Sequence, residues 1–494
     1  MERLENCIRP RQNLKDRQSM LETDEEYCER WITIRIIYLS GFLMFLPFGV
    51  VTTSLWPYLQ EMDSTSGKAF LSVLFAAPPA GQLLFSPLIG WCSNRMSSVR
   101  ILFVLLTALY IFSNALYSVI ELFSIPQRKY IILIARFGFG VATSINTISR
   151  AYISAATKIS ERTKTIAICS LSQTLGLLVG PILQSLFSLL GKDGVVLCGL
   201  RLNMYTSGGW ICALGGTVYL LLLSPSTFVH RTIAFKEALK HKGIGKGVME
   251  NNQSLPMFPI CMIITGYGFL MFFYVSFQTT ISPIALDQFS WSHEESLYYL
   301  GMLLTVGTLC SCLIYLLLPY LSKKYHEHNV LVYFAILPMF LSQVMMIPTG
   351  QQKIEITDSG SGNSTATLFG CTQEGWCNSV PTISRYQLSI SYGMLCVSFS
   401  VGIAITQTIL SKLLGARPQG HWMALYTSVG GIARIIGPGT MLVYIKYGLY
   451  YLFGLGSIVA GVMLIWIWFY REFLHARTKL ATKVPEEQEL ANFQ

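Results

Sequence analysis

The feature that most limits the fold of this chain is a series of long apolar segments. A helix needs about 20 apolar residues to cross ~30 Å of hydrocarbon. Segments of that kind lie at residues 34–59, 69–91, 101–123, 130–154, 166–190, 207–228, 257–285, 296–321, 329–350, 386–411, 421–446 and 449–470. Only 13% of the residues are charged, against about 25% in a typical soluble domain. The sequence therefore predicts an all-α membrane protein with twelve transmembrane helices.

The basic residues indicate how these helices are oriented. Lys and Arg gather in alternate connections and in both tails, whereas the opposite connections are mainly acidic. Because positively charged loops stay in the cytoplasm, both termini are expected there. The predicted parts are a cytoplasmic N-terminal tail (1–33), a six-helix half (34–228), a cytoplasmic central loop (229–256), a second six-helix half (257–470) with a luminal loop (351–384), and a cytoplasmic C-terminal tail (471–494). This spread of basic residues explains the net charge of +10 without nucleic-acid binding.

A weak internal repeat supports the division into two halves. Pro181 follows Glu161 by 20 residues, and Pro438 follows Pro418 by the same interval. Each of these prolines is preceded by a glycine, Gly180 or Gly437. Two such halves around a basic loop are typical of the major facilitator fold.

Short motifs resemble those of that superfamily. The loop sequence Gly-Trp-Cys-Ser-Asn-Arg at residues 90–95 resembles the major facilitator loop motif, with Asn94 where Asp is usual. Arg136 and Gly140 resemble an Arg-x-x-x-Gly signature. Residues 176–181 resemble a Gly-x-x-x-Gly-Pro motif linked to antiporters, although small residues also simply allow close helix packing, which we favour. The residues assigned to conformational motifs are Gly90, Asn94, Arg95, Gly176, Gly180, Pro181, Gly437 and Pro438.

Longer segments carry a closer resemblance. They lie at residues 21–27, 54–60, 161–163, 202–206, 370–377, 417–420 and 433–438. Over almost the whole chain they resemble the lysosomal major facilitator proteins linked to neuronal ceroid lipofuscinosis. The resemblance implies an endolysosomal membrane, a chloride-permeable conductance and recognition by sorting adaptors. An acidic dileucine sorting signal would comprise Asp16, Met20 and Leu21, with Met20 in place of the first leucine. Gln278 stands where the resembling protein has Glu.

The predicted luminal loop has chemistry of its own. Asn363 begins an Asn-Ser-Thr glycosylation acceptor, whereas a second acceptor at Asn252 lies in the basic central loop and should be unused. Cys371 and Cys377 are six residues apart in the same luminal loop. We expect them to form a disulfide, because that side of the membrane is taken to be oxidising.

The predicted spans contain few charged side chains. No Asp or Glu lies in the middle of a span, whereas Arg136, Arg150 and Arg434 do. Because a charge at the bilayer centre costs about 2.5–3.5 kcal/mol, each arginine must face the bundle interior, water, backbone carbonyls or an anion. The predicted transport-pathway residues are Arg150, Arg434, Arg136, Gln278 and Gln173. With no enzyme motif, metal site or cofactor motif, the sequence predicts a pathway for small anions between the halves. A metabolite carrier and a non-transporting membrane adaptor are the alternatives.

Overall fold

The computed structural model describes most of the chain: residues 22–62, 68–96, 98–191, 194–197, 200–234, 236, 256–289, 293–350, 357–358, 368–369, 376, 380–415 and 419–483. Contacts divide these residues into two units. Unit 1 takes the described parts of Met1–Pro256, Ser411–Gly431 and Thr478–Gln494. Unit 2 takes those of Met257–Leu410 and Ile432–Arg477.

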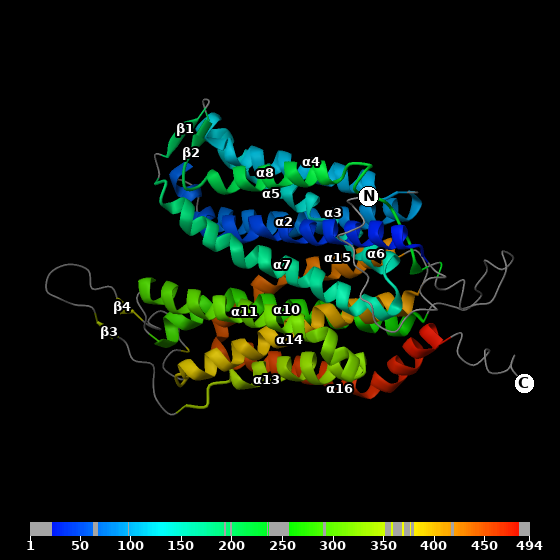
Figure 1. Ribbon diagram of the computed structural model, residues 1–494. Helices are drawn as coiled ribbons and strands as arrows, with labels where there is room; N and C mark the ends of the chain where they lie inside the picture. The colour runs from blue at the N-terminus through cyan, green and yellow to red at the C-terminus, as the bar shows by residue number, and fades with distance from the viewer. Residues whose placement is uncertain are drawn as a thin grey trace, which may run out of the picture. The chain divides into compact units, whose positions relative to one another are not determined.

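Unit 1 is a helical bundle with one small hairpin. Its helices are α2 (Asp24–Met62), α3 (Lys68–Arg95), α4 (Arg100–Ser118), η1 (Ile120–Leu122), α5 (Ile125–Ala142), α6 (Ile145–Ala156), α7 (Ile159–Ser188) and α8 (Ser207–Leu222). Strands β1 (Val195–Leu197) and β2 (Leu200–Leu202) pair antiparallel, with Val196 opposite Arg201. In Figure 1 the long helices lie alongside one another, and the hairpin stands at one end of them.

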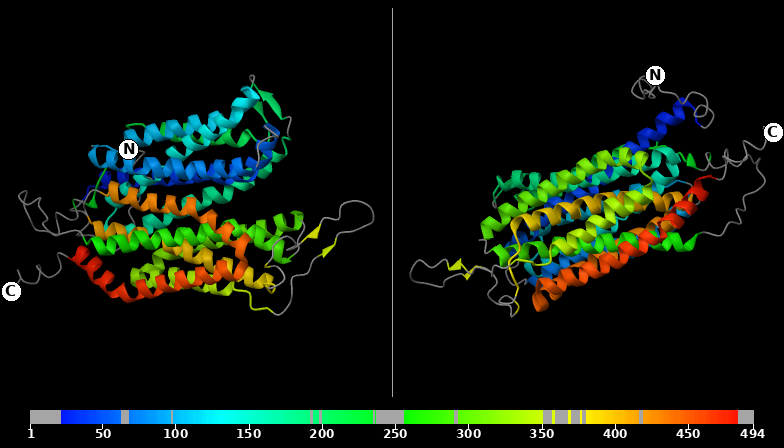
Figure 2. Two further views of the ribbon diagram at one scale, coloured as in Figure 1. Left: turned by 180° about the vertical axis from the view of Figure 1, so that it is seen from behind. Right: turned by 90° about the horizontal axis from the view of Figure 1, so that it is seen from below.

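Unit 2 is built mainly from α10 (Met257–Phe289), α11 (His293–Lys324), α13 (Leu337–Met345), α14 (Arg385–Leu414) and α16 (Thr440–Lys483). Shorter elements are α12 (Glu327–Val330), the π-helix η2 (Leu331–Ile336), β3 (Thr357–Asp358), β4 (Leu368–Phe369) and the 3₁₀ turn η3 (Gly437–Gly439). Helix α15 (Gly420–Ile436) is divided between the units, since its residues up to Gly431 belong to unit 1 and those from Ile432 to unit 2. Figure 2 shows the long helices of each unit running alongside one another.

The helices confirm the twelve predicted spans. Ten stretches of the described residues are long and apolar enough to cross a membrane, and Ser207–Leu222 is a shorter apolar helix. One of the ten, Gly420–Leu474, contains two spans. They are separated at Gly448, whose positive φ of 78° breaks the helix. A side chain there would also collide with Trp376, because a Cβ would lie 2.7 Å from Cδ2 of that ring.

The fourth predicted span is one helix in sequence but two in the structure. Helix α5 ends at Ala142, and α6 begins at Ile145. The intervening Thr143 donates its hydroxyl to the carbonyl of Gly140, at 2.6 Å. Its own carbonyl accepts a hydrogen bond from Nε2 of Gln82. Side chains therefore satisfy the backbone at the break, as buried polar groups require.

Candidate functional site

A polar cluster around Arg150 lies inside unit 1. Arg150 comes from α6 and is 8% exposed. Its Nη1 donates to Oγ1 of Thr427 at 3.1 Å, and its guanidinium carbon lies 5.3 Å from the centroid of the Tyr426 ring. Thr427 and Tyr426 are on α15 and are themselves buried. The guanidinium of Arg150 therefore contacts a neutral hydroxyl and the face of an aromatic ring. The ring face attracts a cation through its quadrupole.

Two amide side chains extend the same cluster. Asn146 lies four residues before Arg150 on α6, so both side chains are on one face of the helix. Nε2 of Gln173, from α7, donates to Oδ1 of Asn146 at 3.3 Å. Both amides are at least nine-tenths buried. The cluster thus offers hydrogen-bond donors and acceptors beside the guanidinium of Arg150, which suits an anionic or strongly polar solute.

Arg136 lies in a different environment on α5. It is 4% exposed, and its guanidinium carbon lies 5.7 Å from the ring centroid of Phe139. Its Nε makes no hydrogen bond with any described residue. The preceding residue, Ala135, belongs to an apolar cluster with Tyr58 and Tyr117. Since 14 residues of mostly helical chain separate Arg136 from Arg150, about 20 Å of axial rise lies between them. The structure does not bring these two arginines together.

The remaining predicted pathway residues belong to unit 2. Arg434 lies two residues before α15 ends and is partly buried. Gln278 is on α10 and is exposed on its unit. Of the five predicted pathway residues, Arg150 and Gln173 are in one cluster, with Asn146 on the same helix face as Arg150.

The predicted loop motif at the end of α3 holds the start of α15. Oδ1 of Asn94 accepts a hydrogen bond from the backbone N–H of Gly420 at 2.8 Å. A Cβ on Gly90 would lie 2.5 Å from Cβ of Ala424, so only glycine allows this approach. Arg95 lies with its guanidinium carbon 4.3 Å from the centroid of the Trp91 ring. Asn94 makes the hydrogen bond that an Asp would make there, but it lacks the charge that favours a helix N-terminus.

The Gly-x-x-x-Gly-Pro segment of α7 packs against α2. A Cβ on Gly176 would collide with the carbonyl oxygen of Phe42, and one on Gly180 would lie 2.5 Å from Cα of Gly49. The following Pro181 is exposed within α7. In the second half, Gly437 and Pro438 form the 3₁₀ turn η3, where a Cβ on Gly437 would lie 3.0 Å from Cγ1 of Val275. The first glycine pair thus sets the distance between two helices.

A further arginine, which was not among the predicted pathway residues, ties helix ends together. Arg162, at the start of α7, is 1% exposed. Its Nη1 donates to the carbonyl of Ser411 at 3.1 Å, and its Nη2 to that of Ser154 at 2.9 Å. We call the contacts of residues 411–431 with α3, α6 and α7 the closure. Their sequence separations, such as 249 for Arg162 and Ser411, give no local signal.

Some predicted sites lie outside the described residues. These are the sorting residues Asp16, Met20 and Leu21, the glycan acceptor Asn363, and the cysteines Cys371 and Cys377. Among the residues that the structure describes, no three His, Cys, Asp or Glu side chains are grouped so that they could hold a metal ion.

Comparisons with known proteins agree on one family. The family model described as Major Facilitator Superfamily matches residues 37–373. The "Major facilitator superfamily domain-containing protein 8" of Xenopus laevis is 29% identical over 444 residues, which cover 85% of this chain and 86% of that protein.

Three solved structures share the fold. The human organic anion transporter MFSD10 has a TM-score of 0.61 at 14% identity, covering 89% of this chain and 99% of that one. The proton:xylose symporter XylE has a TM-score of 0.62 at 14% identity, covering 90% and 96%. A bacterial homologue of the iron transporter ferroportin has a TM-score of 0.58 at 13% identity, covering 89% and 98%.

Proposed function

Because the chain belongs to the Major Facilitator Superfamily, whose members are membrane transporters, we propose that it moves small anions such as chloride across an endolysosomal membrane. The family and the multi-pass helical fold are shown by the matches above. The substrate class and the membrane are the proposal. Resemblance to the lysosomal relatives supports the membrane, and the Arg150 cluster supports the substrate.

The observation that carries the proposal is a buried guanidinium in contact with a neutral hydroxyl and an aromatic ring. Arg150 contacts the hydroxyl of Thr427 and the ring of Tyr426. An anion that displaces the Thr427 hydroxyl gains a charge-assisted hydrogen bond. Because that partner is neutral, the displacement leaves no carboxylate unpaired. Such a contact is favourable enough for an anion to bind and weak enough to release it, as conduction requires.

A carrier of an unidentified small metabolite is the second candidate. The amides of Asn146 and Gln173 favour it, since they present both donors and acceptors beside the arginine. A non-transporting adaptor is less favoured, because membership of a transporter superfamily gives no reason to expect one.

Chloride flux into proteoliposomes, followed with a chloride-sensitive dye, tests the proposal. We expect Arg150→Gln to reduce flux strongly and Arg434→Gln to reduce it as well. The matched control is Arg35→Gln, because Arg35 is exposed, and its flux should equal that of the parent. Unchanged flux in both test variants would make these arginines structural. Flux that disappears when the proton gradient is collapsed would favour the coupled carrier instead.

The proposed topology places both termini in the cytoplasm and residues 351–384 in the lumen. Asn363 is then the used glycan acceptor, so Asn363→Gln should abolish the glycan-dependent mobility shift, whereas Asn252→Gln should not. Peptide mapping without reduction should find Cys371 joined to Cys377. Imaging of a tagged protein at low expression should show late endosomes or lysosomes, if the Asp16, Met20 and Leu21 segment recruits sorting adaptors. Steady residence at the plasma membrane would contradict the proposed location.

A further inference from the structure

Four charged side chains, three of them buried, form a group where the described chain begins. Both oxygens of Glu22 accept hydrogen bonds from Arg30, at 2.9 Å each. Glu22 also pairs with Nζ of Lys158 at 3.1 Å, and Arg30 pairs with Glu161 at 2.9 Å. The side chains of Glu22, Arg30 and Lys158 are 3%, 1% and 5% exposed. We call these four residues the ionic quartet.

Local structure fixes Glu22 at the edge of the quartet. Helix α2 begins one residue after Thr23, whose Oγ1 accepts the N–H of Glu26 at 3.2 Å. The carboxylate of Glu26 in turn accepts the N–H of Thr23 at 3.3 Å. This reciprocal pair is a capping box. Glu22 is therefore held at a fixed point directly after residues 1–21, the segment with the predicted sorting signal.

The quartet continues directly into the closure. Arg30 donates from Nη1 to the carbonyl of Ala156, the last residue of α6. Arg162, the neighbour of Glu161, donates to Ser154 near the same helix end and to Ser411. Two arginines thus hold the C-terminal end of α6, where the helix dipole favours cations. Arg30 is paired with Glu22, whereas Arg162 is hydrogen-bonded to Ser411, the first of residues 411–431.

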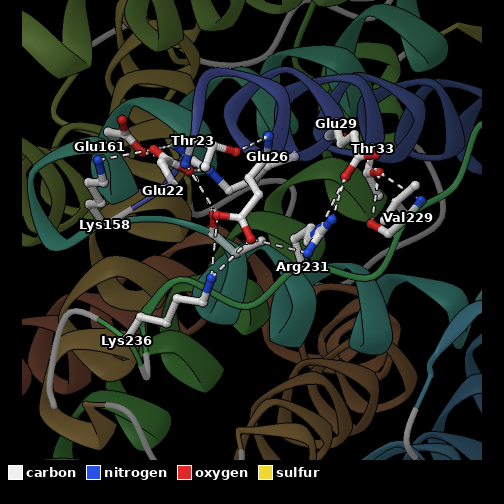
Figure 3. A network of polar contacts seen from close by, with 12 residues as sticks. Glu22, Thr23, Glu26, Glu29, Thr33, Lys158, Glu161, Val229, Arg231 and Lys236 are labelled. Carbon is white, nitrogen blue, oxygen red and sulfur yellow. Dashed lines mark hydrogen bonds and ion pairs between the residues drawn. The ribbon is translucent and has the colours of Figure 1, made fainter. Parts of the chain in front are cut away.

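A second set of ion pairs beside the quartet is much more exposed. Arg231 pairs with Glu29 at 2.9 Å and with Glu26 at 3.2 Å, and Lys236 pairs with Glu26 at 3.2 Å. The side chains of Arg231 and Lys236 are 41% and 51% exposed. Figure 3 shows both sets, with Lys158, Glu161 and Glu22 at the left, Lys236 below them and Arg231 farther to the right, near Glu29. Exposed pairs contribute little to stability, whereas breaking a buried pair leaves an uncompensated charge.

We propose that the ionic quartet is a latch through which the base of the N-terminal tail controls the closure. While Glu22 is in place, Arg30 and Arg162 share the end of α6, and Arg162 keeps its bond to Ser411. When Glu22 is withdrawn, Lys158 and Arg30 lose a buried partner, the α6–α7 turn loosens and residues 411–431 separate more often from α3, α6 and α7. A protein that binds the tail and pulls Glu22 out would therefore change transport.

Cysteine labelling tests the latch without knowledge of the substrate. The reporter is Ser428→Cys, on α15, because Ser428 is 7% exposed. It is made in a background without other reactive cysteines and treated with a maleimide in nanodiscs. We expect Glu22→Gln to raise its labelling rate about tenfold, since loss of a buried pair strongly favours the open form. Glu26→Gln is the matched control and should change the rate by less than about twofold.

A second reporter separates a latch from general unfolding. Ser113→Cys lies on α4 and is 2% exposed, away from the quartet. Its labelling should not change with Glu22→Gln. Equal increases at both reporters would overturn the proposal, because the quartet would then stabilise the whole bundle. No increase at Ser428→Cys would also overturn it.

Deletion of the tail locates the latch. Removal of residues 1–21 leaves Glu22 present, so Ser428→Cys should label at the parent rate. Removal of residues 1–23 takes Glu22 away and should raise the rate as Glu22→Gln does. If removal of residues 1–21 already raises the labelling rate, the control lies in the tail rather than in the quartet. That result would contradict the proposal. None of these measurements depends on chloride flux, so the proposed function can fail separately.

Discussion

The two ends of unit 1 are equally buried but are held by different forces. At the charged end, the ionic quartet joins the start of α2 to α7. At the aromatic end, near the end of α2, Tyr58 is 0% exposed and stacks on Tyr205 with ring centroids 5.1 Å apart. The ring centroid of Tyr117 lies 5.5 Å from that of Tyr58. Removing one member of a buried charge pair leaves an uncompensated charge, whereas rings that move apart leave no charge behind. One end is therefore suited to switching and the other to a fixed support.

Hydrogen bonds at the aromatic end reinforce the fixed support. Oδ1 of Asn203 accepts the N–H groups of Tyr205 and Thr206 at 3.0 and 2.9 Å, and its Nδ2 donates to Glu121 at 2.7 Å. These bonds shape the turn between β2 and α8. The turn places Tyr205 against Tyr58.

The largest expected effect is at the charged end. Arg30→Met leaves Glu22 and Glu161 without their arginine, so we expect a loss of about 3–5 kcal/mol in unfolding free energy. Thermal unfolding in detergent measures it. Arg35→Met, an exposed position on the same helix, should have little effect. Equal losses in the two variants would mean that burial of the pair is irrelevant.

The next largest effect is at the aromatic end. Tyr58→Ala removes a fully buried ring and should cost about 3 kcal/mol. Tyr58→Phe should cost almost nothing, because the Tyr58 hydroxyl has no hydrogen-bond partner among the described residues. Both variants are compared by thermal unfolding. A large loss of unfolding free energy in Tyr58→Phe would show that the aromatic end depends on a directional hydrogen bond. The two ends of unit 1 would then not differ in the kind of force that holds them.

A smaller loss is expected for Asn203→Ala. It removes the acceptor of two backbone N–H groups and the donor to Glu121, and we expect a loss of about 1–2 kcal/mol. Asn114→Ala is the comparison, because Asn114 makes one bond, from Nδ2 to the carbonyl of Tyr110. The melting temperature of Asn203→Ala should be the lower of the two. The reverse order would mean that the β2–α8 turn does not contribute to the support.

The smallest effect is expected for Thr23→Ala, which removes the helix cap and should cost about 1 kcal/mol or less. Labelling of Ser428→Cys should increase only slightly, since Glu22 keeps its pairs with Arg30 and Lys158. If Thr23→Ala opens the closure as fully as Glu22→Gln, the cap rather than the charge holds the latch.

The spans could be predicted because hydropathy is a local property of the sequence. The break at Gly448 also falls where the sequence separates the last two spans. The break between α5 and α6 could not be predicted, since it depends on a bond from Gln82 to Thr143, 61 residues away. Hydrophobic periodicity is local in the sequence and does not indicate such a long-range contact.

The candidate site was predictable only in part, for the same reason. The charge of Arg150 inside an apolar span marks it without any structure. Its partner Thr427 is 277 residues away and is one hydroxyl among many in the sequence. Glu22 and Glu161 are far apart in the sequence, and only the folded chain brings both of them to Arg30.

The turn at Gly448 has a consequence for how the protein is made. A single residue with positive φ joins the last two spans, and so short a turn favours their entry into the membrane together as a helical hairpin. Trp376 packs on this residue, and its Nε1 donates to the carbonyl of Ile445 at 3.1 Å. Residue 376 leaves the ribosome well before the hairpin does, since synthesis runs from the N-terminus. The hairpin therefore docks onto an indole that was synthesised earlier, which makes this contact a late step in biogenesis.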